Sequence, residues 1–75
     1  MITPKELLSY IAKYIEENQI SPTVRELCEL TGANSTETIH RHINRLIEFG
    51  YIEKLDKSPR SIKITDYGKE ILGRG

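Results

Sequence analysis

Residues 23–50 read TVRELCELTGANSTETIHRHINRLIEFG and carry the two helix start signals that set the fold. Thr23 and Glu26 have the spacing of a capping box, and Ser35 is a second residue whose hydroxyl can cap a helix. Gly32 stands between the two signals, where a left-handed residue can end the first helix. The pattern predicts a helix of about eight residues, a turn of roughly three, and a longer helix after it.

The longer helix, residues 35–49, has one apolar face and one polar face. In the shorter helix, Leu27 and Leu30 are expected to point inward. Two brief helices joined by a tight turn that contains glycine, the second of them amphipathic, are typical of a helix-turn-helix. The apolar residues of the longer helix fall at i, i+4, i+7 and i+8: Ile39, Ile43, Leu46 and Ile47.

A further helix is predicted upstream. Thr3 and Glu6 again have capping-box spacing, and Pro4 suits the first helical position because its missing amide needs no partner there. Pro22 lies beyond the end of this helix, since the residue before a proline avoids the helical region. Its apolar residues recur at helical spacing: Leu7, Leu8, Ile11, Tyr14 and Ile15.

After Gly50 the apolar period changes from about 3.6 residues to about 2. Residues 51–55 and 61–64 are short, alternating and rich in β-branched side chains, which predicts two strands. Between them, residues 56–60 read DKSPR, a turn-forming run too long for a two-residue hairpin turn. The pattern therefore predicts a β-hairpin with a basic tip.

The predicted fold class is mainly α with a small β-hairpin, a winged helix-turn-helix with a three-helix core plus a wing. A chain of 75 residues has room for one domain. We expect residues 1–65 to form it. Residues 66–75 should add a short C-terminal helix, capped by Thr65, and a frayed tail.

Composition argues against several classes of protein. Eleven basic and eleven acidic residues give zero net charge, no apolar run approaches a membrane span of about 18 residues, and no N-terminal leader is evident. A single cysteine, Cys28, excludes an internal disulfide and suits a cytoplasmic location. His40 and His42 point to different helix faces and no third ligand stands at metal spacing, so a metal site is not expected. His42 is expected to be a partly buried structural residue. Cys28 has no activating base near it in the sequence and is expected to be a packing or partly exposed thiol. We expect no catalysis, cofactor, metal, small-molecule ligand or membrane partner.

Several short segments occur in a specific order along the chain: SPTVREL at 21–27, Gly32, STETIHRHI at 35–43, Leu46, GYI at 50–52 and PRSI at 59–62. Together they closely resemble the N-terminal DNA-binding domain of the LexA repressor family. Full-length members of that family also carry a Ser-Lys self-cleaving peptidase, which 75 residues cannot hold, so the resemblance implies DNA binding without proteolysis. Residues 65–72 look more like the post-wing helix of MarR- and PadR-type regulators. Both an isolated domain and a small stand-alone regulator remain open.

The resemblance implies that residues 35–49 lie in a major groove and that residues 56–60 lie on the DNA backbone. On a helical wheel of about 100° per residue, the polar face is centred opposite Ile39. Arg41 is expected to make the main specific contact, as a bidentate donor to a guanine. The predicted base readers are Ser35, Thr36, Glu37, Thr38 and Arg41, with His40 at the edge of the face and Asn44 and Arg45 nearer a phosphate strand.

In the wing, Lys57, Ser58 and Arg60 are the predicted DNA contacts, with Arg60 on a phosphate or in a minor groove. Arg25 can reach a flanking phosphate or, equally, pair with Glu29 four residues on. A solvated face, with Glu37 paired to Arg41, is the alternative for the recognition helix. A carboxylate at Glu37 also departs from the small polar residue of many relatives.

The partner expected from the resemblance is double-stranded DNA, with a palindromic operator and a homodimer as further expectations. Residues 35–63 hold six basic and four acidic residues, whereas residues 1–34 hold three and five. The basic excess thus lies where phosphates are expected, although it is small enough to predict weak non-specific binding. The alternative is a winged-helix protein-interaction module, with Tyr10, Tyr14 and Tyr67 on its surface.

Overall fold

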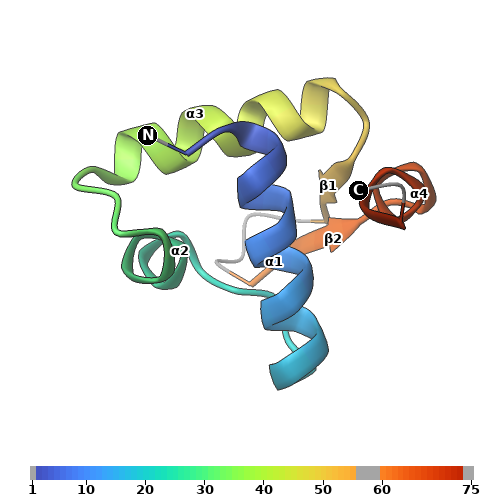
Figure 1. The fold of residues 1–75 in the computed structure, drawn as a ribbon, viewed down its shortest axis with the longest axis horizontal. Helices are drawn as coiled ribbons and strands as arrows, with labels where there is room; N and C mark the ends of the chain where they lie inside the picture. Colours follow the sequence, from blue (N-terminus) through green and yellow to red (C-terminus); the bar gives the residue numbers. More distant parts are fainter. Residues whose placement is uncertain (1, 56–59, 74–75) are drawn as a thin grey trace.

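The computed structural model describes residues 2–55 and 60–73. Three helices are followed by a two-stranded hairpin and a last helix (Figure 1), so the predicted mainly α winged helix-turn-helix is confirmed. The elements are α1 (Pro4–Asn18), α2 (Val24–Thr31), α3 (Thr36–Glu48), β1 (Ile52–Lys54), β2 (Ile62–Ile64) and α4 (Asp66–Gly73).

The helices begin where the capping signals stand. The Thr3 hydroxyl accepts from the Glu6 amide at 3.2 Å, and the Glu6 carboxylate accepts from the Thr3 amide at 3.1 Å. The same reciprocal pair forms at the start of α2, while the Ser35 hydroxyl caps α3. Gly32 ends α2 with a φ of 73°, the left-handed conformation that glycine adopts without steric cost.

The core is a single cluster in which α1, α2, α3 and the hairpin meet. α3 contributes three of the four residues of its predicted apolar face, and one residue of β1 packs beside two residues of β2. All three helices thus bury one side, which leaves the outer side of α3 outside the packing. The buried apolar side chains are Leu7, Leu8, Ile11, Leu27, Ile39, Ile43, Leu46, Ile52, Ile62 and Ile64.

The hairpin is antiparallel, and Ile52 pairs with Ile64. The Thr65 hydroxyl accepts from the Gly68 amide at 3.0 Å, so it caps α4 as predicted. A Cβ on Gly68 would overlap the carbonyl oxygen of Tyr51, and only glycine permits this close approach. α4 therefore packs directly against the residue that precedes β1.

One part of the predicted core is wrong. Leu30 is 48% exposed, and Ile47 is also exposed. The inward stripe of α2 instead runs through Val24, Leu27 and Cys28, a spacing of three and four residues that places Leu30 on the flank of the helix. Cys28 is half-buried, as expected of a packing thiol.

Candidate nucleic-acid interface

The outer face of α3 is open to solvent. Ser35, Thr36, Glu37, His40, Arg41, Asn44 and Arg45 are exposed, and Thr38 is half-buried. All of them belong to one helix and its cap, and the buried side of that helix is fixed by the core. The structure therefore brings the predicted helix residues together on one rigid element, which suits precise placement in a groove.

Glu37 and Arg41 form the ion pair that sequence spacing allowed, at 3.8 Å between Oε1 and the guanidinium. Their side chains are 83% and 65% exposed, so the pair is solvated and contributes a few tenths of a kcal/mol. Such a pair exchanges easily for a stronger partner. Arg41 thus keeps its capacity for a bidentate contact.

His42 lies at the flank of α3 and is half-buried, which agrees with its predicted structural role. Its Nε2 atom is buried and makes no hydrogen bond to the described part of the chain. Among residues 2–55 and 60–73, no group of three or more histidine, cysteine or acidic side chains is arranged to hold a metal ion.

Arg25 is exposed in the first turn of α2, and Glu29 is exposed one turn later. Both residues are described, and no ion pair of 4.0 Å or less joins them. The alternative of an Arg25–Glu29 pair is therefore not realised, and Arg25 is exposed in the first helix of the helix-turn-helix.

The wing residues separate into two groups. Lys57 and Ser58, both predicted DNA contacts, lie outside the described residues. Arg60 is described, and its guanidinium is engaged within the fold: it donates to both carboxylate oxygens of Glu26 at 3.0 Å and to the Ser21 carbonyl at 2.9 Å. Sequence reasoning missed this junction, because its partners are separated by 34 residues or more.

The Glu26 carboxylate also accepts from the Thr23 amide at 2.8 Å and from the Tyr14 hydroxyl at 3.0 Å. The hydrogen bonds from Arg60, followed by those from Thr23 and Tyr14, hold the pKa of Glu26 at about 2, well below its usual value. One carboxylate at the start of α2 thereby joins α1, α2 and the end of the wing.

Lys5 is a candidate that sequence reasoning did not single out. A surface hollow of about 470 Å³ lies between the start of α1 and α3 and is lined by Lys5, Arg41, His42 and Arg45, with Phe49 and Tyr51 at its end. The cations come from helices far apart in the sequence, so periodicity within either helix gives no signal. Their common position flanks the outer face of α3.

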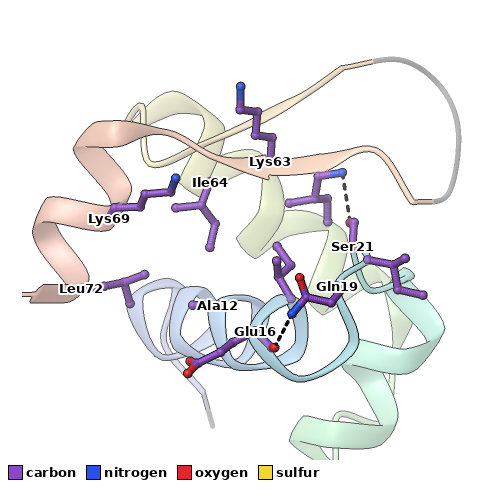
Figure 2. A pocket seen from close by; sticks show the side chains of 11 residues that line it. Ala12, Glu16, Gln19, Ser21, Lys63, Ile64, Lys69 and Leu72 are labelled. Carbon is purple, nitrogen blue, oxygen red and sulfur yellow. Dashed lines mark hydrogen bonds between the residues drawn. The ribbon is translucent and has the colours of Figure 1, made fainter.

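A second hollow, of about 390 Å³, is lined by α1, the connection after it, β2 and α4 (Figure 2). Ala12, Ile64 and Leu72 give it an apolar lining, while Lys63 extends away from it. None of its lining residues belongs to α2 or α3. It is therefore separate from the polar surface described above.

Comparison with known proteins agrees with this geometry. The model of the LexA DNA binding domain family matches residues 3–61. The chain is 48% identical over 67 residues to the LexA repressor of Limosilactobacillus reuteri, a match that covers 89% of the chain and 32% of that relative. For the LexA repressor of Lactobacillus johnsonii, identity is 44% over 68 residues, covering 91% of the chain and 33% of the relative.

The LexA repressor of Caldicellulosiruptor saccharolyticus is 47% identical over 62 residues, which cover 83% of the chain and 31% of the relative. The chain thus spans about a third of the length of the curated relatives it matches. No described helix has the length and apolar character needed to cross a membrane.

Proposed function

Because the chain belongs to the LexA DNA-binding domain family, we propose that it binds double-stranded DNA in a sequence-specific manner and acts as a transcriptional repressor. The observation that carries this proposal is the outer face of α3, which the core fixes in position and leaves open to solvent. A helix of this kind fits the major groove of B-DNA, where each base pair presents its own pattern of donors and acceptors.

The N-terminal half of α3 reads the bases. Arg41 leaves its weak pair with Glu37 and donates two hydrogen bonds to a guanine. Glu37 either keeps that pair or accepts from a cytosine amino group, since a carboxylate beside phosphates is otherwise unfavourable. The remaining predicted base readers are Ser35, Thr36 and Thr38, with His40 at the edge.

Phosphate contacts flank the helix. Arg45 and Lys5 contact one DNA strand from the hollow between α1 and α3. Asn44 contacts the same DNA strand from α3. Arg25 in the first turn of α2 contacts a flanking phosphate of the DNA. Lys57 and Ser58 contact DNA phosphates from the wing. Phosphate contacts of this kind set affinity and register, and they carry no direct sequence information.

The net charge of zero makes the non-specific component small. A single half-site of this size offers few contacts, so we propose that two copies bind a palindromic operator as a homodimer. Their α3 helices then enter the major groove one helical turn, about 34 Å, apart or a multiple of that distance.

The test is a binding-site selection on random duplexes, followed by titration of the selected and a scrambled duplex at about 50 and 200 mM salt. We expect a preferred sequence with two-fold symmetry and an affinity that falls with salt. Equal binding to both duplexes, with no dependence on salt, would exclude the proposal and favour a protein-interaction module.

A further inference from the structure

Glu26 and Arg60 form a junction that the DNA-contact scheme does not use. Each Glu26 oxygen accepts two hydrogen bonds: Oε1 from Arg60 and the Thr23 amide, Oε2 from Arg60 and the Tyr14 hydroxyl. The side chains of Arg60 and Glu26 are 41% and 30% exposed, so the pair is partly shielded from water. We call this arrangement the clasp.

The clasp sits where the wing returns to the body of the domain. Arg60 donates to the Ser21 carbonyl, and two residues later the Ile62 amide donates to the Ser21 hydroxyl at 3.1 Å. The second of these bonds is the dashed line at Ser21 in Figure 2. The chain that leads into β2 is therefore hydrogen-bonded at two positions, Arg60 and Ile62, to Ser21 in the connection between α1 and α2.

We propose that Glu26 and Arg60 are positioning residues for DNA binding, and that the clasp sets the wing relative to α3. A two-stranded hairpin of three-residue strands is marginal by itself, so its orientation depends on what holds its base. A bidentate guanidinium–carboxylate pair fixes direction as well as distance because both groups are planar. Arg60 thus acts through the wing and does not bind a phosphate.

This inference rests on the proposed function, and a competing arrangement makes opposite predictions. Arg60 could leave Glu26 and bind a phosphate when DNA arrives, in which case Glu26 would act as a competitor. Loss of the Glu26 charge would then free Arg60 and tighten binding. In the positioning arrangement, the same loss releases the wing and weakens binding to the selected duplex.

The decisive variant is Glu26→Gln. Glutamine at the third position of α2 still completes a capping box, so the helix keeps its cap while the ion pair is removed. Glu29→Gln is the matched control, because it removes the same charge from an exposed position one turn further along α2. Arg60→Gln removes both the charge and the bidentate guanidinium, whereas Arg60→Lys keeps the charge and removes only the bidentate geometry.

Binding of these variants to the selected duplex is measured over a range of salt concentrations. We expect Glu26→Gln, Arg60→Gln and Arg60→Lys each to bind about tenfold more weakly than Glu29→Gln, with an unchanged salt slope. The double variant Glu26→Gln with Arg60→Gln should bind no more weakly than either single one. A salt slope reduced by about one in Arg60→Gln, near-normal binding by Arg60→Lys and tighter binding by Glu26→Gln would overturn the proposal.

Amide hydrogen exchange of the free protein gives a readout that does not depend on DNA. The Ile62 amide donates to the Ser21 hydroxyl, and the Leu55 amide donates to the Ser61 carbonyl at 3.1 Å. In Glu26→Gln both amides should exchange faster, whereas that of Ile43 in α3 should be unchanged. Unchanged exchange at Ile62 and Leu55 would show that the clasp does not hold the wing. A failed duplex preference with altered exchange would instead contradict the proposed function and leave the clasp standing.

Discussion

The outer face of α3 and the junction around Glu26 use the same kinds of side chain in opposite ways. On α3, Arg41 has one solvated carboxylate partner at 3.8 Å. At the junction, Arg60 donates to both carboxylate oxygens of Glu26 and to the Ser21 carbonyl at 2.9–3.0 Å, and Glu26 also accepts from Thr23 and Tyr14. The guanidinium of Arg60 is hydrogen-bonded within the fold and stabilises it. The guanidinium of Arg41 is solvent-exposed and remains available to a partner.

The largest expected effect is the difference in stability between a substitution on the buried face of α3 and one on its exposed face. Ile39→Ala removes a fully buried side chain and should lower the free energy of unfolding by about 2–5 kcal/mol. His40→Ala, the exposed neighbour, should change it by no more than about 0.5 kcal/mol. Urea denaturation measures the free energy of unfolding of both variants. Similar losses for the two would contradict the division of α3 into a core face and an open face.

Arg41→Ala should weaken binding to the selected duplex by about 1–3 kcal/mol and relax preference at one base pair. Its melting temperature should match that of the wild type, since the Glu37–Arg41 pair is solvated. Titration against duplexes altered at each position, together with a thermal melt, tests this. An equal loss on every sequence would make Arg41 a phosphate contact.

Lys5→Gln tests the flank of the open surface. If the Lys5 ammonium binds a phosphate, removing its charge should weaken binding to all sequences alike and reduce the magnitude of the salt slope by about 0.9. Lys69→Gln is the control, because Lys69 lines the second hollow, which includes no residue of α2 or α3, and the same charge change there should leave the slope unaltered. A weakening confined to the selected duplex would assign Lys5 to base readout.

The smallest effect is the pH dependence of the clasp. The folded pKa of Glu26, about 2, lies below its ordinary value of 4.5, so the stabilisation is complete above about pH 4.5 and disappears as pH falls toward 2. Near neutral pH the wild type should therefore have a higher melting temperature than Glu26→Gln. The difference in melting temperature should shrink between about pH 5 and pH 3. Melting curves across this range measure it. A constant difference would place the stabilising effect elsewhere.

Much of the fold follows from short segments. The capping boxes at Thr3 and Thr23, the cap at Ser35 and the left-handed Gly32 were all predicted and lie where expected. Leu30 was misplaced because α2 is only eight residues long, and two apolar positions do not define the centre of so short a stripe.

Less of the candidate site could be predicted from the sequence. Periodicity placed Arg41, Asn44 and Arg45 on the open face of α3, because one helix determines which of its residues share a side. It gave no means of separating Arg60 from Arg41, since both are arginines in segments predicted to contact DNA. It also missed Lys5, whose position beside α3 depends on how two helices cross.

Local sequence patterns predict where the helices start and stop, where the hairpin lies and which face of α3 is polar. These features depend on contacts within about four residues, which a linear reading can follow. The bonds from Arg60 to Glu26 and Ser21, and from Tyr14 to the same carboxylate, depend on how the whole chain packs. Those partners come together when the hairpin packs on the helices, and no local pattern records a contact across 34 residues.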